Sequence, residues 1–213
     1  MEPDDLSDLA DPSFSAVVLA GGTAVRLDGA DKASVELHGR TLLTHALDAC
    51  LDAREVVVVG DPVPTHRPVT FTREDPRHGG PVAALLTGRD ALLRPARLLG
   101  VLAVDMPHVG PGTFARLRRA VGGGVGGGVA GPDSLDAPVE RDGAVLVAPD
   151  GRHALALVLR TDRLDDVRPT HEEQHGMALR RLLARLDLAE VPALGREHRD
   201  VDTWADLRDL ADG

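Results

Sequence analysis

Residues 16–22 have the sequence Ala-Val-Val-Leu-Ala-Gly-Gly, and this stretch decides the type of fold. A short apolar run with β-branched residues that ends at paired glycines is typical of a buried β-strand followed by a tight turn. Three similar runs follow, at 55–60, 69–72 and 98–104. Segments with apolar residues at helical spacing separate them, at 41–52, 82–93 and 113–121. Strands that alternate with helices predict right-handed βαβ units and a mostly parallel sheet, which is the α/β class.

The second half of the chain departs from this alternation. Apolar runs at 144–147 and 154–160 flank Asp150-Gly151-Arg152, which is a hairpin signal. We therefore expect a smaller antiparallel addition to the sheet. Two further helices are expected, at 176–186 and at 203–210. Either Asp202 or Thr203 is expected to cap the second of them.

The chain is expected to form one domain. Residues 1–14 are acidic and lack periodicity, which predicts a mobile N-terminal extension. Residues 15–213 contain no internal repeat and no clear linker, so they predict a single domain. The run at 122–131 is almost entirely glycine and valine, and it predicts a flexible loop within that domain.

Composition excludes several classes of protein. The chain has 213 residues, 43% of them hydrophobic, so it can bury a core, but only 2% are aromatic, so that core must be aliphatic. A net charge of −10 argues against a nucleic-acid binder, which needs a basic face. Cys50 is the lone cysteine and cannot form an internal disulfide. No apolar run reaches membrane-spanning length and the N-terminus does not resemble a secretion signal, so a cytoplasmic protein is expected.

The loop after the first strand carries the first candidate for chemistry. Gly21 and Gly22 let the backbone approach a ligand closely, so that successive N–H groups point at phosphate oxygens. Arg26 and Lys32 add positive charge, and Lys32 is the one lysine among 24 basic residues. The spacing matches neither a Walker A loop nor Gly-x-Gly-x-x-Gly. An ordinary glycine-rich turn remains the alternative, but the combination favours binding of a nucleotide phosphate.

Asp105 carries the second candidate. It follows the apolar run at 98–104, at the carboxyl end of a predicted parallel strand, where open α/β sheets bind their ligands. A carboxylate at this position suits magnesium (Mg²⁺), a hard cation that prefers oxygen ligands and bridges to substrate phosphates. The alternative is an aspartate that begins a turn or caps the next segment.

Two further segments are less specific. Gly79 and Gly80 before Pro81 predict a second turn at which the backbone can approach a ligand closely. The start of an ordinary helix explains these residues equally well. The string from His171 to His175 matches the zinc-protease pattern His-Glu-x-x-His. That pattern requires a stable helix, and Pro169 and Gly176 flank this segment, so we expect a solvated loop instead.

These motifs together resemble the small nucleotidyltransferases, and among them the molybdenum cofactor guanylyltransferases. The signature of the first loop is carried by Leu19, Ala20, Gly21, Gly22, Arg26, Asp31 and Lys32. The family's second segment is similar to residues 73–85, its metal motif to Asp105-Met106-Pro107, and its C-terminal turn to Asp200-Val201-Asp202-Thr203. The resemblance extends over about residues 15–210. It implies a Rossmann-like, three-layer αβα fold.

The chain departs from the family pattern at several places. Leu27 stands where the family has methionine, and Asp28 stands where it has glycine, which adds a negative charge beside the phosphates. His153-Ala154-Leu155 replaces His-Pro-Leu in the half that faces the acceptor. The glycine-rich run has no counterpart in the family.

The resemblance implies a reaction and a role for each matching residue. GMP would pass from GTP to the terminal phosphate of molybdopterin, and pyrophosphate would leave. Asp105 would hold Mg²⁺, with Asp202 or Asp200 as a further ligand. The N–H groups of residues 20–22, with Arg26 and Lys32, would stabilise the leaving pyrophosphate. The base and ribose would be lined by Leu19, Ala20, Asp75, Gly80 and Pro81.

Two alternatives stay open at this stage. One is a related transferase that uses CTP, or an acceptor such as a sugar phosphate. The other is a nucleotide-binding protein without catalytic activity, which Asp28 and the altered second half permit. The sequence leaves the base preference, the oligomeric state and the presence of a second metal undetermined.

Overall fold

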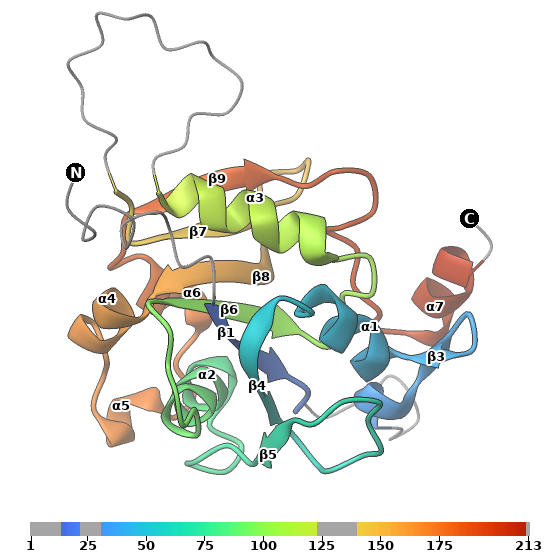
Figure 1. The fold of residues 1–213 in the computed structure, drawn as a ribbon, viewed down its shortest axis with the longest axis horizontal. Helices are drawn as coiled ribbons and strands as arrows, with labels where there is room; N and C mark the ends of the chain where they lie inside the picture. Colours follow the sequence, from blue (N-terminus) through green and yellow to red (C-terminus); the bar gives the residue numbers. More distant parts are fainter. Residues whose placement is uncertain (1–13, 22–30, 123–139, 212–213) are drawn as a thin grey trace, which may run out of the picture.

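The computed structural model describes residues 14–21, 31–122 and 140–211 (Figure 1). Strand β1 (Phe14–Leu19) lies near the middle of the sheet and is buried at all six positions. Ala16 and Val18 pack into the core on one face of the sheet, while Val17 and Leu19 pack into the core on the other. Because both faces of the strand are covered, its sequence is apolar throughout instead of alternating.

One sheet of seven strands, in the order β5-β4-β1-β6-β8-β7-β9, organises the molecule. The other strands are β4 (Ala53–Val59), β5 (Thr70–Thr72), β6 (Leu98–Ala103), β7 (Gly143–Val147), β8 (His153–Arg160) and β9 (Leu188–Pro192). Neighbouring strands from β5 to β6 are parallel, β8 is antiparallel to both β6 and β7, and β9 is parallel to β7. The predicted α/β sheet, mostly parallel with an antiparallel addition, is confirmed.

Helices cover both faces of this sheet, as Figure 1 shows. On one face lie α1 (Leu42–Ala49) and α3 (Pro111–Val121), which contribute to the core that contains Ala16 and Val18. On the other face lie α2 (Pro81–Asp90), α4 (Thr161–Asp166) and α6 (Leu179–Leu183). Helix α7 (Trp204–Ala211) packs near the small hairpin of β2 (Glu36–Leu37) and β3 (Arg40–Thr41). The expected three-layer αβα arrangement is confirmed.

Four local predictions need correction. The helix expected at 176–186 is shorter and spans only Leu179–Leu183, because Gly176 has a φ of +71° that no α-helix accommodates. Residues 171–174 form a single helical turn, α5, where a loop was expected. The hairpin β2–β3 lies in a segment that was expected to be a loop, and β9 forms where no strand was expected.

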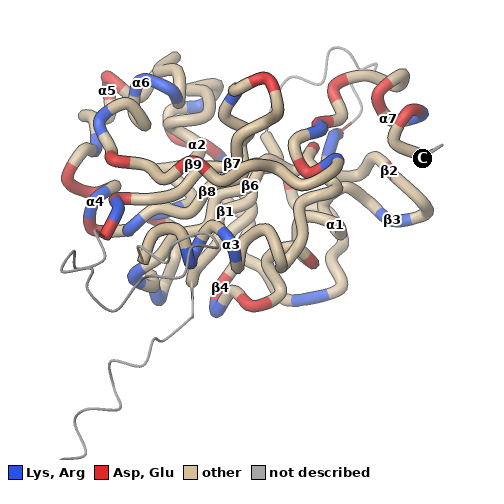
Figure 2. The backbone as a smooth tube through the Cα atoms, turned by 90° about the horizontal axis from the view of Figure 1, so that it is seen from above, with Lys and Arg blue, Asp and Glu red and all other residues tan. Residues whose placement is uncertain are grey.

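Several expected features lie outside the described residues. These are residues 1–13 of the N-terminal extension, the glycine-rich run from residue 123 onward, and the loop positions Gly22, Arg26, Leu27 and Asp28. Acidic and basic residues are interspersed along the described backbone (Figure 2).

Candidate active site

A cleft of about 670 Å³ lies at the carboxyl ends of the parallel strands. It is lined by Leu19, Ala20 and Gly21 at the end of β1, and by Val59 and Gly60 at the end of β4. Residues from the start of α2 and from the end of β6 also line it, including Gly80, Pro81, Ala84 and Asp105. Its volume is in the range of small-molecule sites, and its position is the edge where open α/β sheets bind ligands.

Two glycines shape this cleft. Gly80 precedes α2 with a φ of +86°, a conformation that side chains strongly disfavour. A Cβ atom at Gly60 would lie 3.0 Å from the Cβ of Ala20, so the absence of a side chain lets the ends of β1 and β4 approach each other. The backbone N–H of Ala20 donates to the carbonyl of Val59 over 2.9 Å and fixes this approach.

The cluster of Lys32, Asp105 and Asp202 lies at one end of the cleft. The Lys32 ammonium donates to Asp105 Oδ2 and to Asp202 Oδ1, each over 2.8 Å. Burial alone would lower the pKa of Lys32, but the hydrogen bonds to both carboxylates outweigh it and raise that pKa. Burial raises the pKa of Asp105, and the Lys32 ammonium only partly opposes this rise. Lys32 is therefore firmly charged and neutralises a pair of carboxylates.

Short local structures hold each member of this cluster. Asp31 caps a 3-10 turn (Lys32–Ser34) by accepting from the backbone of Ala33 over 3.1 Å, and this turn places Lys32. The carbonyl of Asp105 accepts from the N–H of Val201 over 2.9 Å, which ties the C-terminal loop to the end of β6. Thr203 accepts from the N–H of Asp206 and so caps α7, and the carboxylate of the preceding residue, Asp202, accepts from Lys32.

The β9–α7 loop that carries Asp202 is itself anchored to α3. Glu197 accepts hydrogen bonds from Arg116 Nη2 over 2.6 Å, from the Thr113 hydroxyl over 2.6 Å and from the N–H of Leu194 over 2.7 Å. Its side chain is 13% exposed. The loop position is therefore set by a largely buried ion pair with α3.

The donor set of this cluster fits a divalent cation. Two carboxylates share one ammonium at equal distances of 2.8 Å, so their oxygens converge on a single point. Asp200 lies near enough to add to the negative potential at Asp105. Within residues 14–21, 31–122 and 140–211, no three His, Cys, Asp or Glu side chains form a metal cage. One or two carboxylates with water and substrate phosphates is the arrangement that magnesium prefers, whereas zinc needs three or four protein ligands.

A second, smaller pocket of about 220 Å³ adjoins the cleft. It shares Ala103, Asp105 and Leu155 with the cleft, so Asp105 lies at the boundary between them. Its other charged or titratable lining residues are Arg152, His153, His198 and Asp200. Two pockets that meet at one carboxylate can hold two substrates on either side of it.

The structure brings most of the predicted site residues together. Those that line the cleft are Leu19, Ala20, Gly21, Lys32, Gly80, Pro81 and Asp105. Asp202 joins them through Lys32. Gly22 and Arg26 lie outside the described residues.

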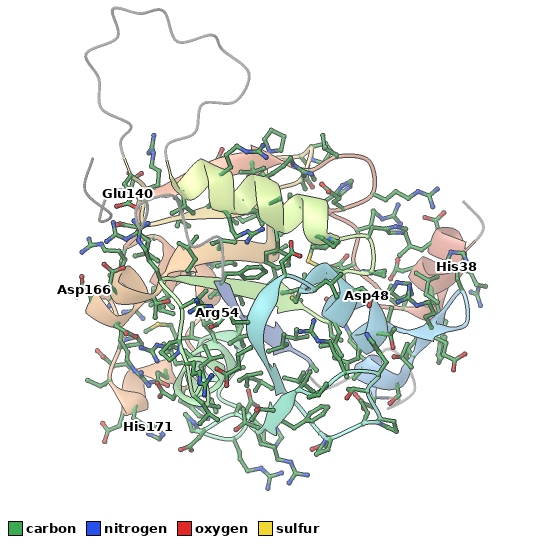
Figure 3. All side chains as sticks on the ribbon, in the orientation of Figure 1. His38, Asp48, Arg54, Glu140, Asp166 and His171 are labelled. Carbon is green, nitrogen blue, oxygen red and sulfur yellow. The ribbon has the colours of Figure 1, made fainter. Side chains whose placement is uncertain are left out.

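Asp75 does not line the cleft. Its side chain is 77% exposed and lies 3.4 Å from Nε2 of His171 on α5, whose position Figure 3 shows. The cleft is lined instead by charged or titratable neighbours that the sequence analysis did not assign: Asp61, Arg73, Glu74, Arg77 and His78. The signal for most of them was their position beside the Gly79-Gly80-Pro81 turn.

The string His171–His175 has no site geometry. Thr170 and Glu173 form a reciprocal capping box around the one turn of α5, and His175 already has an extended backbone. His171 and His175 are exposed. The pattern is therefore explained by helix capping.

Comparison with known proteins agrees with this geometry. Residues 16–191 match the family described as the MobA-like NTP transferase domain. A protein of Acidiphilium cryptum named molybdenum cofactor guanylyltransferase is 41% identical over 53% of this chain, and the match spans 62% of that relative, less than two thirds of its length. A protein of the same name from Burkholderia ambifaria is 31% identical over 73% of this chain and 75% of the relative.

Solved structures show the same fold. The molybdopterin-guanine dinucleotide biosynthesis protein A of Archaeoglobus fulgidus has a TM-score of 0.67 at 17% identity, over 93% of this chain and 97% of the other. A Mycobacterium tuberculosis protein solved in complex with manganese has a TM-score of 0.59 at 18% identity, over 94% of this chain and 98% of the other. At these identities the likeness concerns the fold alone.

Proposed function

The chain belongs to the family of MobA-like NTP transferase domains, and from this premise we propose that it transfers GMP from GTP to the terminal phosphate of molybdopterin. The observation that carries the proposal is the cluster of Lys32, Asp105 and Asp202 at the boundary of two pockets. A cleft for the nucleotide and a pocket for the acceptor meet there. The expectation of a nucleotidyltransferase is confirmed by the family and by the names of its relatives.

The reaction joins two anions, so positioning and charge neutralisation dominate it. An oxygen of the acceptor phosphate attacks the α-phosphorus, the bond from that phosphorus to the β-phosphate oxygen breaks, and pyrophosphate leaves. The acceptor phosphate is already ionised, so no general base is needed. The backbone N–H groups that follow β1 and the Lys32 ammonium would stabilise the leaving group, with Arg26 as a further proposed cation.

We propose magnesium as the metal of this site, held by Asp105 and Asp202. When bound, Mg²⁺ supplies positive charge that offsets the repulsion between acceptor and α-phosphate. The two converging carboxylates fit such an ion. Once phosphates enter the cleft, the Lys32 ammonium has new anionic partners, so its hydrogen bonds to both carboxylates can be exchanged for contacts with phosphate oxygens.

The remaining assignments are also proposals. Residues 15–213 would act as a single catalytic domain on small molecules in the cytoplasm, and Phe14, which was expected in the extension of residues 1–14, belongs to β1 of this domain instead. Across the described helices, none has the length and apolarity needed to cross a bilayer.

The decisive experiment asks whether the labelled α-phosphate of GTP is transferred to the pterin. The protein is incubated with molybdopterin, Mg²⁺ and GTP that is labelled at the α-phosphate. We expect label to move to the pterin and unlabelled pyrophosphate to appear in equal amount. Retention of all label in GTP, under conditions where GTP binding is detected, would favour a nucleotide-binding protein without activity.

A thermal-shift panel separates GTP from other nucleotides. GTP, CTP, ATP and UTP are each added with Mg²⁺, and the nucleotide with the lowest Kd stabilises the folded protein most. We expect the largest shift with GTP. A larger shift with CTP would favour the alternative cytidylyl transfer.

A further inference from the structure

We propose that Glu74 recognises the guanine base, by accepting hydrogen bonds from its N1–H and its N2 amino group. This inference rests on the proposed function, because it concerns the base of the same nucleotide. It differs from the assignment that the resemblance implied, in which Asp75 is the carboxylate beside the base. The order of strands along the cleft and the partners of each carboxylate in it both point to Glu74.

The order of strands places Glu74 at the opposite end of the cleft from Asp105. Asp105 follows β6, Gly21 follows β1, Gly60 follows β4, and Glu74 follows β5. These four strands are consecutive neighbours in the sheet, so three strand spacings, roughly 14 Å, separate the first position from the last. A nucleotide whose phosphates lie near Lys32 and Asp105 therefore extends its base across β1 and β4 toward β5.

Within the described part of the chain, Glu74 differs from the other carboxylates of the cleft because no side chain or backbone group pairs with it. Asp31 caps the turn that carries Lys32, Asp61 accepts from Arg73 Nε over 2.8 Å, and Asp105 accepts from Lys32. Among the described residues that line the cleft, Glu74 is the one carboxylate for which no hydrogen bond or ion pair exists. It is half-buried, so a base that covers it must satisfy its oxygens or leave them unpaired at a cost.

The chemistry of the bases then decides which nucleotide fits. Guanine presents two adjacent donors, N1–H and the N2 amino group, which match the two oxygens of a carboxylate. Adenine and cytosine present an unprotonated ring nitrogen where guanine has N1–H, and that lone pair repels a carboxylate. Hydrogen bonds to a charged group are stronger than those between neutral groups. A base that leaves the carboxylate unpaired therefore binds more weakly than guanine does.

The contrast with Asp75 makes the assignment specific. The Asp75 side chain is 77% exposed and lies beside His171, whereas Glu74 lines the cleft. The two residues are neighbours in the chain, so exchanging their roles would require the segment after β5 to rotate. The base-binding carboxylate is therefore assigned to Glu74, one residue before Asp75.

The test measures the affinity of the full chain, with Mg²⁺, for GTP, ITP and XTP by calorimetry. ITP lacks the N2 amino group, and XTP carries a carbonyl oxygen in its place. For the unaltered protein we expect binding to weaken roughly ten- to hundredfold from GTP to ITP, and further for XTP. Glu74→Gln should weaken GTP binding by a similar factor and improve XTP binding, because the Gln amide donates to the xanthine oxygen while its carbonyl accepts from N1–H.

Two further variants make the result decisive. Glu172→Gln makes the same chemical change on exposed α5 and should leave all three affinities unchanged. Asp75→Asn tests the rival residue, and a loss of GTP preference there instead of in Glu74→Gln overturns the inference. Equal affinities for GTP and ITP overturn it as well, yet leave the proposed transferase intact. Tightest binding of CTP, or no binding of any nucleotide by the unaltered protein, overturns both.

Discussion

The Lys32 ammonium donates to the carboxylate of Asp105 over 2.8 Å, across 73 residues of sequence. It donates equally to Asp202, which lies 170 residues from it in the chain. An ammonium is a compact charge with three donors, so it can bridge two carboxylates that converge on one point. This contact explains why one lysine persists in a chain whose other 23 basic residues are all arginine.

Lys32→Ala is expected to lower turnover at least tenfold, because it removes a cation that pairs with the phosphates and organises the two carboxylates. Steady-state release of pyrophosphate measures the effect. Lys32→Arg should recover little of the loss, since the planar guanidinium does not fit between Asp105 and Asp202. If the kinetics of Lys32→Ala were unchanged, Lys32 would not be part of the active site.

Asp105→Asn is expected to abolish turnover that depends on Mg²⁺, because the amide carries no charge to hold a divalent cation. Electron paramagnetic resonance with Mn²⁺ as the probe should show weaker metal binding in the same variant. Asp166→Asn, at an exposed position of α4, serves as the matched control and should retain both properties. A fully active Asp105→Asn protein would contradict the metal assignment.

Glu197→Gln is expected to lower the free energy of unfolding by about 1–3 kcal/mol at neutral pH, because it weakens the charged hydrogen bonds that anchor the β9–α7 loop. Burial alone would raise the pKa of Glu197, but the hydrogen bonds from Arg116 and Thr113 outweigh it and hold that pKa below its ordinary value of 4.5. A lowered pKa means that this stabilisation is present above pH 4.5 and is lost as the pH falls through the folded-state pKa.

Urea titrations at several pH values test this expectation. The difference in unfolding free energy between the unaltered protein and Glu197→Gln should be largest above pH 4.5 and shrink below it. A difference that does not vary with pH would show that the carboxylate charge is not what anchors the loop.

Gly88→Ala is expected to destabilise the protein by about 1–3 kcal/mol, through overpacking of α2 against the sheet. A Cβ atom there would lie 2.5 Å from Val17 Cγ1 and 2.9 Å from Val59 Cγ2, both in the strands that carry the cleft. Gly112→Ala on α3 is the matched control, because a Cβ there meets nothing within 4 Å. It should be neutral or stabilise by up to about 1 kcal/mol. Thermal unfolding compares the two, and equal midpoints would contradict the packing argument.

Local patterns predicted much of the fold but not its short elements. The apolar runs at β1, β4 and β6 were predicted because a strand buried on both faces must be apolar throughout. Strand β9 was missed because only Val191 of its five residues is buried, so its apolar signal is weak. The helix at 176–186 was overestimated because its leucines recur at helical spacing, although the backbone at Gly176 interrupts the helix.

Local sequence patterns were enough to predict the class of fold, the glycine-rich turns and the presence of Lys32 and Asp105 at the ends of their segments. Those features follow from the side-chain period of strands and helices and from the conformational freedom of glycine, which act within a few residues. Three features became visible only in the folded chain: Asp202 meets Lys32, Glu74 and not Asp75 lines the cleft, and Glu197 anchors the loop. Such contacts depend on which segments the sheet order brings together and on which way each side chain then points, and neither quantity is set by local sequence.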